Sequence, residues 1–145
     1  MTENCHKCFS VMLVDDDEDD YLLFRDAIEK LEVPAEITWV SDPEEVNQHL
    51  LPKTLPDLIF LDLNMPRKDG FEVLTDLKKD KQFCLIPVIV LTTSNAAEDV
   101  ERCYLLGVNS YMKKPNEFSQ LHRMLKVTFS YWFETALLPK RGQND

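Results

Sequence analysis

Two short segments of this chain are apolar at consecutive positions, and they constrain the fold more than any other feature. They are Asp57–Leu63 (DLIFLDL) and Ile86–Thr92 (IPVIVLT). An extended strand with this pattern has apolar side chains on both faces. Such strands are typical of the centre of a parallel sheet that helices cover on both sides. We therefore expect a buried sheet between two layers of helices.

The rest of the chain alternates predicted strands with predicted helices. Further strands are expected at Phe9–Val14, Glu36–Val40 and Val108–Lys113. Helices are expected at Tyr21–Leu31, in a short segment after Asp42, at Gly70–Asp80, in a segment opened by Asn95 and Glu98 and ended by Gly107, and in a long segment from about Glu117. In the short segment, Pro43 follows the cap residue Asp42 and Glu45 lies three residues after it, which is the pattern of a capping box. Five such βα units predict an α/β fold, a doubly wound five-stranded parallel sheet with five helices on both faces.

The composition favours one domain that neither crosses a membrane nor grips nucleic acid. The chain has 145 residues and a net charge of −10, whereas a sequence-independent grip on nucleic acid needs Lys and Arg side chains against the phosphates. No apolar stretch approaches the roughly 20 residues of a membrane span, and the first residues lack the basic and apolar regions of a signal peptide. We expect a cytoplasmic protein with one domain over residues 9–138, between tails at 1–8 and 139–145.

The four cysteines suit that compartment and predict no metal site. Cys5 and Cys8 form a CxxC, but a structural zinc site needs about four ligands and the chain has no second CxxC. Haem attachment would need His directly after Cys8, where Phe9 stands. Cys84 and Cys103 lie within apolar patterns and are predicted to be buried thiols.

Polar side chains stand at or just after the ends of four of the predicted strands. Asp15 and Asp16 follow the first strand, Asp62 the third, Thr92 ends the fourth and Lys114 follows the fifth. In open α/β sheets, ligands bind outside the carboxyl ends of the strands. We therefore expect these side chains to meet at one edge of the sheet.

Six consecutive carboxylates, Asp15–Asp20, follow the first strand, and about half of them have a structural explanation. Asp17 is well placed as the cap of the first helix, and residues 18–20 then fall in its first turn, where the positive end of the helix dipole favours anions. Asp15 and Asp16 remain. Mg²⁺ prefers oxygen ligands and usually takes one or two carboxylates. This pair is therefore a candidate cation site.

Asp62 is the candidate reactive group, because an aspartate can attack a phosphoryl donor and form an acyl phosphate. Such a transfer relies on positioning and on neutralising charge on the phosphoryl oxygens. The Lys114 ammonium could supply part of that charge, and the Thr92 hydroxyl could donate a hydrogen bond to a phosphoryl oxygen.

Four segments carry a close resemblance to response-regulator receiver domains. They are the acidic pair after the first strand, LIFLDLNMPRKDGFEVL, IPVIVLTTS and SYMKKP, in the order and spacing of the family over about residues 9–130. The resemblance implies a flavodoxin-like sheet with strand order 2-1-3-4-5. It also implies a switch that is phosphorylated by a histidine kinase or a phosphotransfer protein and that is not an enzyme beyond its own phosphorylation and dephosphorylation.

The resemblance also assigns roles by position. It implies that Asp62 is the phosphoacceptor and that Lys114 and Thr92 contact the phosphoryl group. It implies a Mg²⁺ site, in which Mn²⁺ can substitute, formed by Asp15, Asp16, Asp62 and the backbone carbonyl of Asn64. Thr92 and Tyr111 match the switch positions of the family.

Two backbone features are expected near these residues. The Lys114–Pro115 bond is similar to one that is cis in the family. Met65–Pro66 and Asp69–Gly70 predict a tight loop after Asp62, in which Gly70 is free to take a positive φ.

Other classes of protein fit the sequence less well. A dehalogenase-type phosphotransfer enzyme wants a second Asp two residues after the nucleophile, where Asn64 stands, and a nucleotide-binding module needs a Gly-rich loop in a chain that has three glycines. Six carboxylates in the first loop would repel the phosphate of a flavin. A degenerate receiver that binds partners without phosphorylation is the remaining alternative, although all the signature positions are filled.

The end of the chain suggests how a signal would leave the domain. After Phe133 about a dozen residues remain, too few for an effector domain, so we expect output through changed protein contacts. Phe129–Pro139 resembles the end of stand-alone receivers that partner bacteriophytochrome-type kinases. Apolar side chains continue past the stripe of the last helix, which favours a homodimer through this helix. Its predicted interface comprises Phe129, Trp132, Phe133 and Leu137. The alternative is that this segment folds back and caps its own core.

Overall fold

The computed structural model describes residues 8–139, which form a five-stranded parallel sheet in the order β2-β1-β3-β4-β5. The strands are β1 (Phe9–Val14), β2 (Ala35–Val40), β3 (Leu58–Leu61), β4 (Val88–Thr92) and β5 (Ser110–Lys113). Every neighbouring pair runs parallel. All residues of β3 and β4 are buried, as the consecutive apolar positions predicted. The doubly wound fold and its strand order are therefore confirmed.

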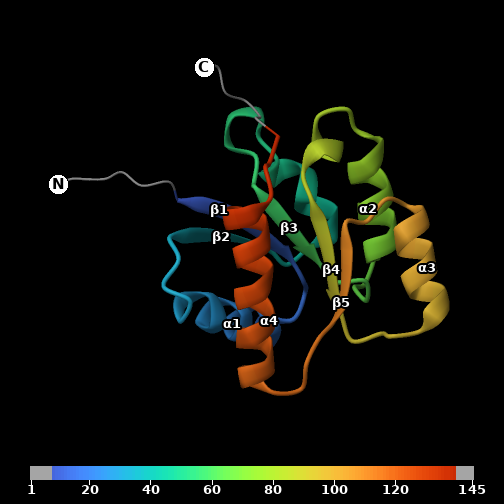
Figure 1. The fold of residues 1–145 in the computed structure, drawn as a ribbon. Helices are drawn as coiled ribbons and strands as arrows, with labels where there is room; N and C mark the ends of the chain where they lie inside the picture. Colours follow the sequence, from blue (N-terminus) through green and yellow to red (C-terminus); the bar gives the residue numbers. More distant parts are fainter. Residues whose placement is uncertain (1–7, 140–145) are drawn as a thin grey trace.

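Helices cover both faces of the sheet (Figure 1). One face carries α1 (Glu18–Glu29) and α4 (Phe118–Ser130), and the other carries α2 (Gly70–Lys79) and α3 (Ala97–Leu105). Because successive side chains of a strand point to opposite faces, β1 supplies both cores. Met12 and Val14 pack with α2, whereas Val11 and Leu13 pack with α1 and α4.

The short helix expected after Asp42 is a 3₁₀-helix, η1 (Pro43–His49), followed by a second short turn, η2 (Pro52–Thr54). The Asp42 side chain accepts the amide of Glu44 at 3.0 Å, so Asp42 is the cap, but the capping box predicted with Glu45 is wrong. A segment this short, enclosed between two prolines, has too few residues to recover the cost of starting an α-helix. Among the described residues, a capping box is present in α2, where Asp69 and Glu72 cap one another.

The segment before α3 also differs from the expectation. The helix begins at Ala97 with Ala96 at the cap position and no side-chain cap, so Asn95 lies one residue before the cap and two before the helix. Its end is as predicted. Gly107 has φ 101, and the amide of Val108 bonds back to the carbonyl of Cys103 at 3.0 Å, which is the pattern of a glycine-terminated helix.

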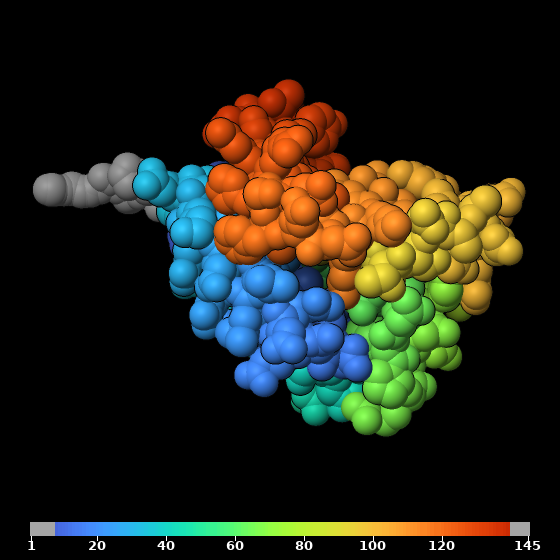
Figure 2. All heavy atoms as spheres, turned by 90° about the horizontal axis from the view of Figure 1, so that it is seen from below, coloured from blue at the N-terminus to red at the C-terminus, as the bar shows by residue number. Residues whose placement is uncertain are grey.

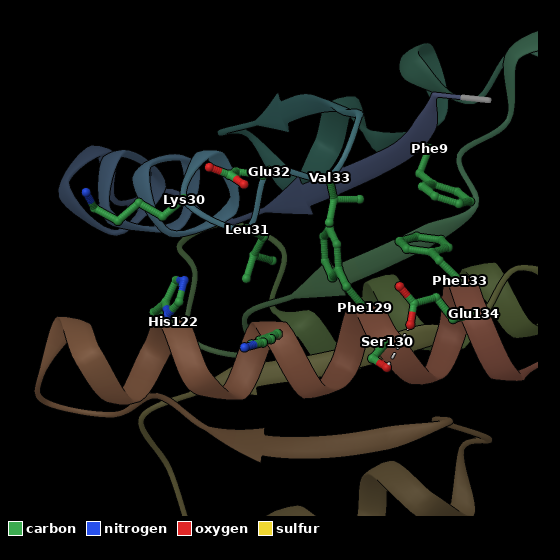
Figure 3. Close-up of a pocket in the computed structure, with 11 residues that line it drawn as sticks. Phe9, Lys30, Leu31, Glu32, Val33, His122, Phe129, Ser130, Phe133 and Glu134 are labelled. Atoms are coloured by element: carbon green, nitrogen blue, oxygen red, sulfur yellow. Dashed lines mark hydrogen bonds between the residues drawn. The ribbon is translucent and has the colours of Figure 1, made fainter. Parts of the chain in front are cut away.

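The chain after α4 folds back onto its own domain. It forms a single π-helical turn, η4 (Tyr131–Thr135). The Phe133 ring stacks on Phe9 with centroids 4.0 Å apart, and Phe129 meets Phe133 edge-on at 5.1 Å. These rings line a groove of about 420 Å³ between the end of α1 and α4 (Figure 3). Phe129 is 2% exposed, whereas Leu137 is 98% exposed.

This packing bears on two predictions about the last segment. The self-capping alternative describes Phe129 and Phe133, whose rings lie against the domain. The dimer interface expected at Phe129, Trp132, Phe133 and Leu137 stays a prediction. The expected tails at 1–8 and 139–145 fall almost wholly outside the described residues, as does Cys5.

Within the described part of the chain, no helix is both long and apolar enough to span a membrane.

Candidate phosphoacceptor and metal site

The carboxyl ends of the strands bring together segments that are far apart in the sequence. Seen from below, segments coloured blue, green, yellow and orange meet on one face of the molecule (Figure 2). Asp15 and Asp16 follow β1, and Asp62 follows β3, which pairs with β1. One carboxylate oxygen from each of these three residues lies within 4.8 Å of the other two. The predicted acidic cluster is therefore present.

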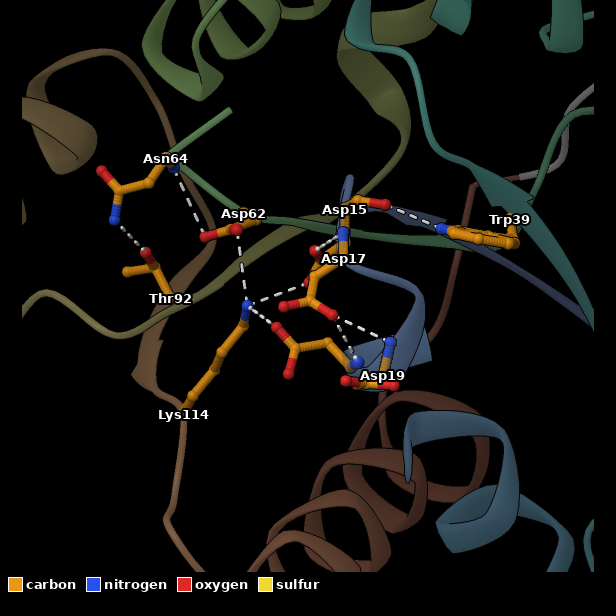
Figure 4. Close-up of polar contacts among 9 residues, drawn as sticks. Asp15, Asp17, Asp19, Trp39, Asp62, Asn64, Thr92 and Lys114 are labelled. Atoms are coloured by element: carbon orange, nitrogen blue, oxygen red, sulfur yellow. Dashed lines mark hydrogen bonds and ion pairs between the residues drawn. The ribbon is translucent and has the colours of Figure 1, made fainter. Parts of the chain in front are cut away.

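Lys114 points into this cluster from the loop after β5 (Figure 4). Its ammonium donates to Asp15 at 2.9 Å, to Asp20 at 2.6 Å and to Asp62 at 3.4 Å. Burial alone lowers the pKa of Lys114, but the hydrogen bond to Asp20 and the charges of Asp15 and Asp62 outweigh it, so the pKa lies above its usual range. The ammonium is therefore charged throughout the physiological range.

Asp20 is a member of the site that the sequence analysis missed, because it assigned this residue only to the helix dipole. Asp20 lies in the first turn of α1, and that turn is aimed at the strand ends by Asp17, whose side chain accepts the amides of Asp19 and Asp20. Its carboxylate makes the shortest contact of Lys114. The predicted cap at Asp17 could have revealed this role of Asp20. A helix that is capped next to the site places its first turn, and so Asp20, beside the strand ends.

Asp15 is almost completely buried, and its environment opposes its charge. Burial raises the pKa of the Asp15 carboxyl to about 6, against the lowering effects of the Asp17 amide, which donates to it at 2.9 Å, and of Lys114. The charge of Asp62 adds to the increase. A cation bound beside Asp15 would stabilise the ionised form, so the local electrostatics favour cation binding.

Asp62 is 6% exposed and is positioned by both neighbouring elements. Its amide donates to the carbonyl of Val14 at 3.0 Å, and its carboxylate accepts the amide of Asn64 at 3.4 Å. The Asn64 side-chain amide lies 3.5 Å from the hydroxyl of Thr92, a residue that is fully buried at the end of β4. Asp62, Asn64 and Thr92 therefore share one small region of the site.

The loop after Asp62 needs Gly70 for a reason other than the one predicted. Gly70 does not have a positive φ; within the described residues, the position of this loop that does is Arg67, with φ 66. A Cβ on Gly70 would lie 2.3 Å from the carbonyl oxygen of Asp62 and 2.6 Å from the Cα of Leu63. The prediction of backbone freedom was wrong, and the glycine permits close approach of α2 to the strand end. Arg67 is held by an ion pair with Asp42 at 2.9 Å.

Tyr111 connects β5 with the loop after β4. Its hydroxyl donates to the backbone carbonyl of Ser94 at 2.9 Å, two residues past Thr92. The Ser94 hydroxyl donates in turn to Asp99 in α3 at 2.6 Å. The two predicted switch residues are thus joined through one short loop.

The expected cis bond between Lys114 and Pro115 is absent, since the described residues contain no cis peptide bond. The trans form is the lower-energy state of most such bonds. The Lys114 amide donates to the carbonyl of Thr92 at 2.6 Å, and this bond holds the loop against β4.

The donor set fits a hard divalent cation. Four carboxylates surround the site and Lys114 is their cationic partner, so negative charge remains when all of them are ionised. Asp15, Asp16 and Asp62 supply the oxygen ligands that Mg²⁺ and Mn²⁺ prefer, and the exposed side of Asp16 leaves room for coordinated water. The site is therefore consistent with divalent metal binding. The carbonyl of Asn64 as a further ligand stays a prediction.

Comparison with known proteins agrees with this geometry. The family model of the response regulator receiver domain matches residues 11–126. The chain is 36% identical over 129 residues to the probable methanogenesis regulatory protein FilR2 of Methanothrix harundinacea, covering 86% of this chain and 83% of FilR2. It is 35% identical over 135 residues to response regulator Rcp1 of Synechocystis, covering 89% of this chain and 92% of Rcp1.

Two solved structures are also similar. The phosphorylated cyanobacterial phytochrome response regulator RcpA superposes with a TM-score of 0.85 at 38% identity, over 92% of this chain and 100% of RcpA. The Mn²⁺-bound form of Rcp1 superposes with a TM-score of 0.82 at 34% identity, over 91% of this chain and 99% of Rcp1.

Proposed function

Because this chain belongs to the response regulator receiver family, we propose that Asp62 is its phosphoacceptor and that a sensor histidine kinase, directly or through a phosphotransfer protein, is the donor. The observation that carries this proposal is the position of the Asp62 carboxylate. It lies at a strand end, within 4.8 Å of the carboxylates of Asp15 and Asp16 and 3.4 Å from the Lys114 ammonium.

In the proposed step, an Asp62 carboxylate oxygen attacks the phosphorus of a phosphohistidine. A P–O bond forms, the P–N bond breaks, and the imidazole nitrogen keeps the electron pair and is protonated by solvent. Charge on the transferring group is spread over its oxygens, so positive groups at fixed positions lower the barrier. Mg²⁺, held by Asp15, Asp16, Asp62 and the Asn64 carbonyl, would supply part of that charge. Lys114 would supply another part.

The residues at the end of β4 and in β5 would then transmit the change. An oxygen of the new phosphoryl group would accept a hydrogen bond from the Thr92 hydroxyl. The Thr92 segment leads into Ser94, whose carbonyl accepts the Tyr111 hydroxyl at 2.9 Å. A shift of this loop would therefore move the Tyr111 side chain and change the surface that β5 and α4 form.

The relatives indicate a partner class. RcpA is a phytochrome response regulator, and we propose a bacteriophytochrome-like kinase for this chain as well.

We place the protein in the cytoplasm and the receiver domain over residues 9–138. We propose that it has no enzymatic activity beyond its own phosphorylation and dephosphorylation, and that it signals by changed protein contacts, including a homodimer through α4 and the segment after it.

The direct test uses acetyl phosphate and Mg²⁺ with intact-mass measurement. Wild type should gain one phosphoryl group that is stable in acid and labile in base, and Asp62→Ala should gain none. Asp76→Ala is the matched control, since it removes an exposed carboxylate of α2 that pairs with Lys68. An equal gain in Asp62→Ala would refute the assignment and leave the phosphorylation-independent binding module as the alternative.

A further inference from the structure

Trp39 makes a polar contact with the site from the opposite side to Lys114. It lies in β2, and its indole N–H donates to the backbone carbonyl of Asp15 at 2.7 Å (Figure 4). An indole offers one donor and no acceptor, so this bond uses its whole hydrogen-bonding capacity. The acceptor is the carbonyl of the peptide unit that joins Asp15 to Asp16.

The orientation of that peptide unit determines the position of Asp16. Because the peptide bond is planar, the direction of the Asp15 carbonyl also fixes the amide and the Cα of Asp16. Asp15 has further restraints, since its amide donates to Val40 and its carboxylate accepts from Asp17 and Lys114. Asp16 is exposed, and within residues 8–139 its carboxylate makes no hydrogen bond or ion pair. Its location therefore depends on the backbone that carries it.

The indole is itself held in place. The Tyr21 ring stacks on it with centroids 4.4 Å apart and planes 3° from parallel, and the Arg25 guanidinium lies 5.9 Å from the centroid of Tyr21. Tyr21 and Arg25 belong to α1, whereas Trp39 belongs to β2. The stack fixes the direction of the indole N–H, and so the direction of the carbonyl that accepts it.

We propose that Trp39 is a positioning residue for the metal ligand Asp16, an inference that rests on the proposed metal site. The hydrogen bond holds the Asp15–Asp16 peptide in the orientation that brings the Asp16 carboxylate within 4.8 Å of Asp15 and Asp62. Without it, the peptide can rotate and the exposed ligand spends less time beside the other two.

The test compares Mg²⁺ affinity by calorimetry in wild type, Trp39→Phe and Trp132→Phe. Trp39→Phe keeps an aromatic ring for Tyr21 and removes the N–H, while Trp132→Phe makes the same exchange in η4, away from the site. Loss of one hydrogen bond predicts a dissociation constant about threefold to tenfold higher for Trp39→Phe. Trp132→Phe should bind as wild type does. Equal affinity in Trp39→Phe and wild type would overturn the inference, as would equal losses in both variants.

Two further measurements separate positioning from general stability. At saturating Mg²⁺, Trp39→Phe should be phosphorylated by acetyl phosphate at the wild-type rate, because Asp62 and Lys114 are untouched; a deficit that saturating Mg²⁺ does not relieve would contradict positioning. In a nitrogen–proton correlation spectrum of wild type, Mg²⁺ should shift the indole signal of Trp39 and leave that of Trp132 in place. An unmoved Trp39 signal would contradict the inference. If wild type binds no Mg²⁺, the proposed metal site itself fails and this inference with it.

Discussion

The Lys114 ammonium lies 2.6 Å from the carboxylate of Asp20 and 3.4 Å from that of Asp62. The residue best placed to neutralise a phosphoryl group on Asp62 therefore makes its shortest contact with a different acid, in the first turn of α1. A phosphoryl group would have to compete with Asp20 for this ammonium. Removing the Asp20 carboxylate should therefore leave the Lys114 ammonium freer to contact the phosphoryl group.

Asp20→Asn should increase the phosphorylated fraction at equilibrium with acetyl phosphate, by about twofold to fivefold, because the net value of an ion pair whose acid is partly exposed is up to about 1 kcal/mol. Intact-mass measurement at limiting donor gives the fraction. The matched control is Asp19→Asn, which removes an exposed charge from the same turn. A fraction that falls in Asp20→Asn would mean that Asp20 assists the phosphorylated state.

Asp16→Ala should weaken Mg²⁺ binding strongly and slightly stabilise the metal-free fold. It removes one of three clustered oxygen ligands and also one of several like charges. Because Asp16 is exposed, water and salt screen the repulsion, so the gain in unfolding free energy should stay near or below about 0.5 kcal/mol. Urea titration in a chelator measures it. Glu18→Ala is the contrasting control. The Glu18 carboxylate interacts favourably with the positive end of the α1 dipole, so its removal should destabilise the fold. Unaltered Mg²⁺ affinity in Asp16→Ala would argue against the metal site.

Gly70→Ala should destabilise the protein by about 1–3 kcal/mol and impair phosphorylation, because the new methyl group meets the backbone of Asp62 and Leu63, which cannot move without displacing β3. Urea unfolding gives the first effect and acetyl phosphate labelling the second. Gly107→Ala separates the two glycine roles. Its methyl group meets nothing closer than 3.5 Å, on the Lys78 side chain, so its cost comes from φ 101 alone and phosphorylation should persist.

How far the sequence predicted this molecule depends on how local each feature is. Consecutive apolar positions in β3 and β4, the helical stripes and the cap at Asp17 are properties of short segments, and they predicted the sheet and the principal helices. The strand-end rule then placed the carboxylates, because the ends of parallel strands must meet. The contact between Lys114 and Asp20 depends on two side-chain conformations across the fold.

Two failures have different physical causes. A glycine can serve positive φ or close approach, and only the packing of α2 against the end of β3 shows that Gly70 serves the second. Cys84 and Cys103 have similar apolar surroundings in the sequence, yet Cys103 is fully buried and Cys84 is only partly so. Burial is set by which face of the element meets the core, and short 3₁₀ turns such as the one that carries Cys84 have no strong periodicity to show it.

The two thiols should therefore differ in reactivity with iodoacetamide. Burial raises the pKa of Cys103 to about 11 from 9.0, so at neutral pH almost none of it is the reactive thiolate. Peptide mapping should show Cys84 alkylated first and Cys103 only in denaturant. The raised pKa also determines how Cys103 affects stability as the pH changes. The folded state holds the thiol proton more tightly than the unfolded state. The stability that Cys103 contributes is therefore complete below about pH 9 and is lost as pH rises through about 11. Rapid labelling of Cys103 in the folded protein would contradict its burial.

The proposed homodimer leads to a test that distinguishes surface from core in the last segment. Val127 and Tyr131 are four residues apart, hence on one face of the helix, and are 65% and 52% exposed, while Leu137 is 98% exposed. Exposed apolar groups of this kind mark interfaces, and most homo-oligomers are two-fold dimers. Phe133, in contrast, stacks on Phe9 within the domain. Leu137→Asp should then weaken association without lowering the free energy of unfolding, whereas Phe133→Ala should lower that free energy by about 1–2 kcal/mol, since the ring is partly buried.

Light scattering over a range of concentrations, with and without acetyl phosphate and Mg²⁺, measures association, and urea unfolding measures stability. Dimerisation of wild type in at least one phosphorylation state, lost in Leu137→Asp, would support the proposed interface. Since Tyr111 on β5 bonds to the loop after Thr92, the dimer should also respond to phosphorylation, and Tyr111→Phe should reduce that response by removing the bond to Ser94. A wild-type chain that stays monomeric at high concentration in both states would exclude the dimer and leave self-capping as the role of this segment.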